Sequence, residues 1–199
     1  MAARKPHHHG NLRAALIEAG TKLLAEGGPD ALSIRKAAAL VGVSHAAPAH
    51  HFPTLVEFRS AVLQEGFRQF TETMEAEIRQ TGGTPHQDLL AGARGYLRFA
   101  LNNPSMFQMM FGGAEADWQS AELSEAAMKS YEVLQRICAP LMPSPAGAEG
   151  NEILVWSIVH GFASLVLTEN KGFRELADPL ATLEAIFPSL PMKPGASDT

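Results

Sequence analysis

The chain has 199 residues, of which 46% are hydrophobic and 19% charged, and its formal net charge is −5. This length and apolar content suit one or two globular domains, so wholesale disorder is excluded. A single cysteine, Cys138, cannot form an internal disulfide, which excludes a disulfide-stapled secreted protein and favours a reducing, cytoplasmic compartment. The first residues lack the apolar core of a secretory signal, so export is not expected.

Charge is distributed unevenly along the chain. Residues 1–60 hold seven Lys/Arg against four Asp/Glu, a balance of +3, and six of the eight histidines. The remainder holds nine basic and seventeen acidic residues, a balance of −8. A mildly basic head on an acidic body suggests that only the head meets a polyanion, although chance clustering gives the same numbers.

Breakers and apolar spacing predict three helices in the N-terminal third. The first spans 11–26 and stops at Gly27-Gly28-Pro29. Ser33 is a good N-cap for a short helix that ends at Gly42. Ser44 is predicted to cap a third short helix through 51, closed by Pro53.

The rest of the chain has the same helical period. Helices are predicted over 54–80, from Pro85 to just before Pro104, and over 105–111, 117–139, 149–170 and 179–187, with a frayed tail after them. No run shows the sustained alternation of a strand, so the expected fold class is all-α. The most apolar run, 153–167, is shorter than the ~20 residues that cross a bilayer and is interpreted as a buried helix, with no membrane span.

The stretch from Ser33 to Phe52 carries the most chemical information. Two short helices can cross steeply through a tight turn where the contact residue is small and the turn residue accepts positive φ, as Ala38 and Gly42 do. This is the pattern of a helix-turn-helix, whose second helix enters the DNA major groove. An ordinary αα-hairpin in a bundle fits the spacing as well.

At this point the sequence resembles the TetR family of bacterial transcription regulators. The resemblance rests on the Gly-Gly stop, the Ser33 to Ser44 block, the 51–53 ending and the long helix after it. The segments 8–12 and 103–107, and Trp156 with His160-Gly161, resemble a subgroup whose regulatory domain has a Trp and His-Gly signature. The resemblance implies a helix-turn-helix domain over 1–53 and a ligand-binding and dimerisation domain over 54–199.

The resemblance also implies which residues face a double-stranded DNA operator: Ser33, Arg35, Ser44, His45, Ala46, His50 and His51. Serine hydroxyls suit phosphates, and arginine suits a phosphate or a base edge. The sequence departs from relatives at Ala49 and Leu55, where tyrosine and lysine usually contact phosphates. Weaker and less salt-dependent DNA binding is therefore expected.

The histidines at 7–9 suggest a metal-binding tract, part of a tag, or a partly protonated arm near DNA, and we interpret them as the arm. No histidine has clear partners at ligand spacing, so no metal site is predicted, and no cofactor is expected.

Methionines and aromatic residues suggest an adaptable apolar cavity in the C-terminal part, with dense core packing as the alternative. The candidate ligand-binding residues are Phe67, Phe70, Met106, Phe107, Met110, Phe111, Trp118, Tyr131, Trp156 and His160. His160 either orients a ligand or bonds to a backbone carbonyl, and the carbonyl is favoured. Because the 153–167 helix is apolar all round, a twofold-related copy is expected to cover its outer side, giving a homodimer.

These observations predict a cytoplasmic, dimeric transcription regulator, interpreted as a repressor released from its operator by a small apolar ligand. The alternative is a small-molecule-binding or scaffolding dimer of the same fold that has lost specific DNA recognition. An enzyme has little support, because the sequence contains no phosphate loop, nucleophile elbow or compelling acid/base pair.

Overall fold

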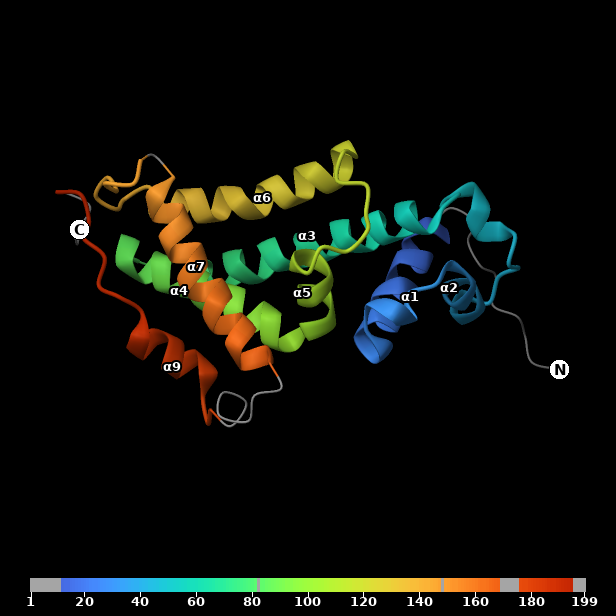
Figure 1. Cartoon of the computed structure of the whole chain (residues 1–199), viewed down its shortest axis with the longest axis horizontal. Coiled ribbons are helices and arrows are strands. Elements are labelled where there is room, and N and C mark those ends of the chain that lie inside the picture. Colours follow the sequence, from blue (N-terminus) through green and yellow to red (C-terminus); the bar gives the residue numbers. More distant parts are fainter. Residues whose placement is uncertain (1–11, 82, 148, 169–175, 195–199) are drawn as a thin grey trace.

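The computed structural model describes residues 12–81, 83–147, 149–168 and 176–194, and it is elongated (Figure 1). One end, here called the head (residues 12–53), contains α1 (Leu12–Gly27), η2 (Pro29–Ala31), α2 (Ile34–Val41) and η3 (Ala47–His50). The other end, here called the lobe (residues 83–194), contains α4 (Pro85–Asn102), α5 (Pro104–Phe111), α6 (Ala121–Cys138), α7 (Gly150–Leu167) and α9 (Pro179–Ile186). The long helix α3 (Leu55–Thr81) joins the two ends. The described residues contain an isolated bridge, Leu141 with Met192, and no named strand, so the all-α prediction is confirmed.

The head packs its helices around the first turns of α3. Phe58 of α3 is fully buried and stacks edge-on against Phe52, with ring centroids 5.1 Å apart. A Cβ on Gly20 of α1 would lie 2.7 Å from Phe58 and 2.8 Å from Val62, so only glycine allows α1 to approach α3 this closely. The orientation of the head is therefore coupled to α3.

The turn between the two short head helices forms as predicted. Ser33 occupies the N-cap position of α2 with extended backbone, although its side chain makes no capping bond. Ala37 and Ala38 are fully buried, and Gly42 ends the helix with φ 77°, in the left-handed region. The small-residue contact and the glycine turn are both confirmed.

The predicted third α-helix is wrong, because residues 44–51 form only the four-residue 3₁₀ helix η3. An α-helix capped by Ser44 needs a bond from the N–H of residue 48 to the Ser44 carbonyl, and Pro48 has no N–H. The shorter bonds form instead, from Ala47 N to Ser44 O at 3.1 Å and from Ala49 N to Ala46 O at 3.2 Å. Pro48 itself is buried and anchors η3 to the head.

The lobe is built on the close pairing of α3 with α4. A Cβ on Gly95 of α4 would lie 2.5 Å from Met74 Cα, so the two backbones nearly touch there. Glu77 of α3 is buried and pairs with Arg98 at 2.6 Å and with Arg94 at 3.7 Å. A capping box between Thr84 and Gln87 begins α4, one residue before Pro85.

Most predicted helix boundaries hold within one or two residues, with two exceptions. α6 begins at Ala121 and not at Asp117, because Ser120 is its N-cap and the preceding residues form a turn against α3. α7 ends at Leu167, with Thr168 as its C-cap. The predicted His7–His9 arm lies outside the described residues. The prediction of a frayed tail after residue 187 is wrong for the described part, because Met142 N donates to Pro191 O and Lys193 N donates to Pro140 O, both at 2.8 Å.

α7 has the length and apolar composition of a membrane-crossing helix, with a mean hydropathy of 1.3 over 18 residues. One face of it packs into the lobe through Val155, Val159 and Ala163, and it contacts α4, α6 and α9. Only 33% of the helix is buried within the chain, so the interpretation as a buried helix holds for one face of α7. Its outer face leaves Ile153 60% exposed.

Candidate ligand cavity and DNA-binding surface

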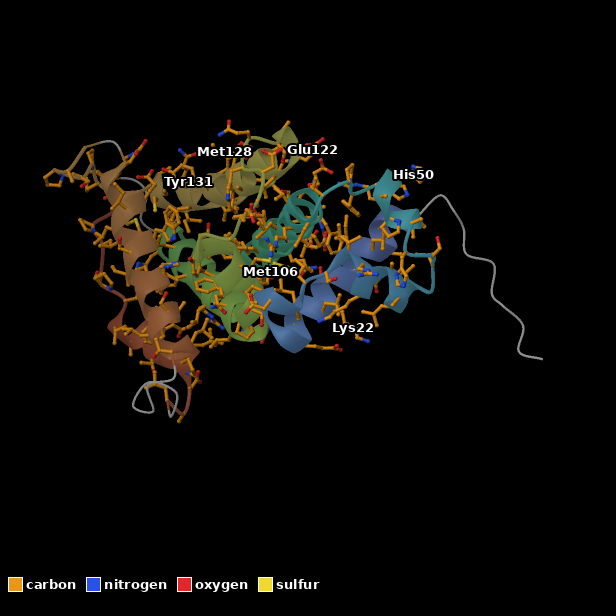
Figure 2. All side chains as sticks on the ribbon, turned by 45° about the vertical axis from the view of Figure 1, so that its right-hand side comes forward. Lys22, His50, Met106, Glu122, Met128 and Tyr131 are labelled. Carbon is orange, nitrogen blue, oxygen red and sulfur yellow. The ribbon has the colours of Figure 1, made fainter. Side chains whose placement is uncertain are left out.

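The residues predicted to face DNA lie together in the second half of the head. Ser33 is half-buried and the other six are exposed: Arg35, Ser44, His45, Ala46, His50 and His51. His50 lies at the end of the head that is remote from the lobe (Figure 2). The surface thus presents a guanidinium, hydroxyls and imidazoles to solvent, which are groups that bind phosphates and base edges.

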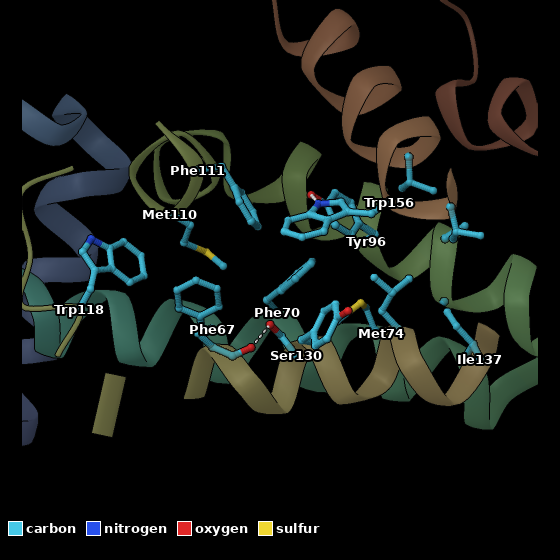
Figure 3. A pocket seen from close by; sticks show the side chains of 17 residues that line it. Phe67, Phe70, Met74, Tyr96, Met110, Phe111, Trp118, Ser130, Ile137 and Trp156 are labelled. Carbon is cyan, nitrogen blue, oxygen red and sulfur yellow. Dashed lines mark hydrogen bonds between the residues drawn. The ribbon is translucent and has the colours of Figure 1, made fainter. Parts of the chain in front are cut away.

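A cavity of about 280 Å³ lies within the lobe (Figure 3). Side chains from α3, α4, α5, α6 and α7, together with Trp118 of the α5–α6 linker, line it. None of these residues is charged: Phe67, Phe70, Met74, Gly92, Ala93, Tyr96, Met110, Phe111, Trp118, Ala127, Ser130, Tyr131, Leu134, Ile137, Val155, Trp156 and Val159. The site is therefore suited to an apolar molecule.

Small residues on facing helices explain why the space stays open. Gly92 and Ala93 of α4 and Ala127 and Ser130 of α6 all line the cavity and contribute little volume to it. The aromatic residues around them are held by other contacts. Phe70, for example, packs edge-on against Tyr96 with centroids 4.9 Å apart.

Two of the lining residues, Tyr96 and Trp156, form a polar group with His160, which lies outside the cavity wall. The indole N–H of Trp156 donates to Tyr96 Oη at 3.3 Å, and Tyr96 Oη lies 2.8 Å from His160 Nδ1. Burial raises the pKa of the Tyr96 hydroxyl and lowers the pKa of His160 below its ordinary value of 6.5. Both side chains are therefore neutral at pH 7. The expectation that His160 bonds to a backbone carbonyl is wrong, because its partner is a side-chain hydroxyl.

Seven of the ten candidate ligand-binding residues line this one cavity: Phe67, Phe70, Met110, Phe111, Trp118, Tyr131 and Trp156. Phe107 and His160 instead line a separate depression between α5 and the end of α7. Met106 packs against α3, where a Cβ on Gly66 would meet its sulfur at 2.5 Å.

Sequence reasoning missed Tyr96, which links the cavity to His160. Its position on an apolar helix is typical of a core residue. A polar partner was not visible from spacing, because His160 and Trp156 lie at least 60 positions further along the chain.

The cavity and the head are connected through α5 and through the linker after it. α5 contributes Met110 and Phe111 to the cavity wall, and the same helix contacts α1 and η2 of the head. Figure 2 shows Met106 of α5 between the lobe and the head.

The linker that follows α5 is bonded to the first turns of α3. Asp117 N donates to Ser60 Oγ at 2.8 Å, and Arg59 pairs with Glu115 at 3.3 Å. The same linker places Trp118 in the cavity wall, where its ring packs edge-on against Phe67. A displaced Trp118 would thus move a segment attached to α3 next to the head.

Comparison with known proteins tests the family resemblance that the sequence shows. The family model for the tetracyclin repressor-like C-terminal domain matches residues 89–189, just over half of the chain. A search of curated proteins found no match.

Several solved structures have this fold. A protein of unknown function from Rhodococcus sp. RHA1 is 27% identical, covers 92% of this chain and 94% of its own, and has a TM-score of 0.76. A tetR-family transcriptional regulator from Streptomyces coelicolor is 20% identical, covers 90% and 78%, and has a TM-score of 0.66. FadR from Bacillus subtilis, solved in complex with stearoyl-CoA, is 14% identical, covers 86% and 94%, and has a TM-score of 0.63.

The fold is that of an all-helical transcriptional regulator, with an N-terminal domain of the DNA-binding type and a C-terminal helical domain. The chain belongs to the TetR family of transcriptional regulators, and the resemblance seen in its sequence is confirmed.

Proposed function

We propose that this protein is a cytoplasmic, dimeric repressor that leaves its DNA operator when a small apolar ligand enters the lobe cavity. The observation that carries the proposal is that α5 forms part of the cavity wall and also contacts the head. FadR, which has this fold, was solved in complex with stearoyl-CoA, and this supports ligand binding by the present chain. The proposal assigns no enzymatic step to the chain.

Release requires the ligand to bind more tightly to one arrangement of the head than to another. Equal affinity for both arrangements would leave the equilibrium between them unchanged. A ligand that displaces Phe111 or Trp118 would push on α5 and on the linker. α5 would transmit the displacement to α1, and the linker to α3 through Ser60 and Arg59. Because two heads must fit successive major grooves, a small tilt of each would break the fit.

The outer face of α7 supports the dimer. Ile153, Leu154 and Leu165 are 60%, 43% and 44% exposed, and a Cβ on Gly161 would meet no atom within 4 Å. Such an apolar strip with a glycine at its centre suits a second copy packed closely against it. In this arrangement residues 54–199 would serve ligand binding and dimerisation, and residues 1–53 would serve DNA binding.

A binding titration tests the proposal. The full chain is titrated onto the DNA upstream of its own gene and onto a scrambled fragment, over a range of salt and with a panel of neutral aromatic compounds. We expect tighter binding to the upstream DNA and a sharp loss of affinity with at least one compound. If compounds bind the lobe and operator affinity never changes, the coupling is refuted.

Two variants locate the DNA surface. Arg35→Ala removes a head cation from the predicted surface, so affinity should fall and the salt slope should drop by about one. Lys22→Ala removes an equal charge from α1, where Lys22 is exposed and pairs with Glu26 at 3.8 Å. This control should leave the salt slope unchanged.

The second candidate function is a ligand-binding or scaffolding dimer without specific DNA recognition. Two observations favour it. The element expected to enter the major groove, η3, is a short 3₁₀ helix. Ala49 and Leu55 also lack the hydroxyl and the ammonium group with which relatives contact phosphates. Equal affinity and equal salt slope on upstream and scrambled DNA would select this function.

A further inference from the structure

The lobe cavity has a defined size and an uncharged wall. An apolar cavity of 150 Å³ holds a benzene molecule, so about 280 Å³ suits a molecule of roughly two aromatic rings. None of the lining residues is a cation that would pair with a carboxylate or a phosphate. An anionic head group, such as that of the stearoyl-CoA held by FadR, would therefore find no cationic partner in this wall.

Charge near the cavity also disfavours an anion. Burial, followed by the negative charges of Glu149 and Glu152, raises the pKa of Tyr131, which lines the cavity. These carboxylates would repel a ligand anion that approaches this side of the cavity.

The polar end of the cavity presents one donor next to one acceptor. An indole N–H can only donate, so Tyr96 Oη accepts from Trp156. The Tyr96 hydroxyl then donates its hydrogen bond to His160 Nδ1. The other histidine tautomer carries a proton on Nδ1 and would leave the buried Tyr96 hydroxyl without an acceptor. Tyr96 Oη keeps one lone pair. The Trp156 bond, at 3.3 Å, is longer than usual and is readily shared with a second acceptor.

We infer that the lobe cavity recognises an uncharged aryl alcohol of about two rings, whose hydroxyl donates to Tyr96 Oη and accepts from Trp156 Nε1. This inference rests on the proposed function for the role of the cavity. His160 is a positioning residue. It accepts the hydrogen bond of the Tyr96 hydroxyl, and this orients the free lone pair of Tyr96 Oη toward the ligand. The remaining wall contributes apolar and aromatic contact (Figure 3).

Matched probes test the inference by calorimetric titration of the full chain at pH 7, without DNA. The probes share the naphthalene skeleton: 2-naphthol, 2-methoxynaphthalene, naphthalene, the anion 2-naphthoate and the cation 2-naphthylmethylammonium. 2-Naphthol should bind about three- to tenfold more tightly than naphthalene or the methyl ether, which cannot donate. 2-Naphthoate should bind at least ~100-fold more weakly than 2-naphthol, because it loses its hydration without gaining a cationic partner. 2-Naphthylmethylammonium should also bind more weakly than 2-naphthol, because none of the lining residues is an anion.

Two Tyr→Phe variants separate the polar end from the rest of the wall. Tyr96→Phe should abolish the preference for 2-naphthol and leave naphthalene binding within about twofold. Tyr131→Phe makes the same change elsewhere in the cavity and should keep the preference. His160→Gln retains an acceptor for the Tyr96 proton and should also keep it.

The inference would be overturned if either ion bound more tightly than 2-naphthol, or if 2-naphthol and naphthalene bound equally well. It would also be overturned if none of the probes bound. Because these titrations contain no DNA, their failure leaves operator binding to be judged by its own titration. Loss of operator binding, in turn, would leave the probe preferences unchanged.

Discussion

The close approach of α4 to α3 at Gly95 allows a quantitative test of the lobe through the variant Gly95→Ala. The new Cβ would lie 2.5 Å from Met74 Cα and 3.0 Å from Met74 N and Thr73 O, all backbone atoms that cannot rotate away. Overpacking of this kind costs about 1–3 kcal/mol, and alanine returns about 1 kcal/mol of helix propensity. We therefore expect a net loss of up to about 2 kcal/mol and a Tm lower by up to roughly 8 °C.

Gly92→Ala is the matched control on the same helix. Its Cβ would meet Ile137 Cδ1 at 2.6 Å, but this is the end of a flexible side chain that borders the cavity and can move into it. The Tm should stay constant or rise, while the cavity becomes smaller. Thermal unfolding followed by circular dichroism compares the two variants. If Gly95→Ala is as stable as Gly92→Ala, the backbones of α3 and α4 do not approach as described.

Three further outcomes are expected. Because burial lowers the pKa of His160, the unfolded chain takes up a proton first as pH falls below 6.5. Stability is then lost below that pH, and Tm measured at pH 7.5 and 5.5 should fall further for the wild type than for His160→Gln. Ala49→Tyr with Leu55→Lys should tighten operator binding, and the added lysine should steepen the salt slope by about one; an unchanged slope contradicts DNA binding by this face. Ile153→Glu should shift the protein toward monomer in sedimentation equilibrium, whereas an unchanged dimer places the interface elsewhere.

Helix positions were predictable because breakers and caps act locally. Pro85, Pro104 and the Gly112-Gly113 pair set helix boundaries through their own backbone preferences, whatever surrounds them. The third head helix does not form as an α-helix for an equally local reason. Pro48 stands four residues after Ser44 and has no N–H to donate the first α-helical bond.

The sequence predicted that an apolar cavity forms in the lobe, but it did not predict all of the residues that line the cavity. Its aromatic wall could be guessed from the residues of α5, but membership depends on which side each helix turns toward its neighbours. Met106 turns toward Gly66 of α3, while Met110, one turn later on the same helix, lines the cavity. Tyr96 could not be predicted as a polar cavity residue, because its partners Trp156 and His160 lie on α7 and only the fold brings them next to it.

The cavity also has an energetic consequence for regulation. Core voids cost about 24 cal/mol per Å³, so about 280 Å³ corresponds to at most about 7 kcal/mol relative to a filled core. Both tryptophans of the chain line this space and are about two-fifths exposed, so solvent reaches its edges and the real cost is smaller. A ligand that fills the space recovers part of this free energy while it displaces α5 or the linker. In the proposed mechanism, only the part of this free energy that differs between two arrangements of α5 and the linker would shift the position of the head.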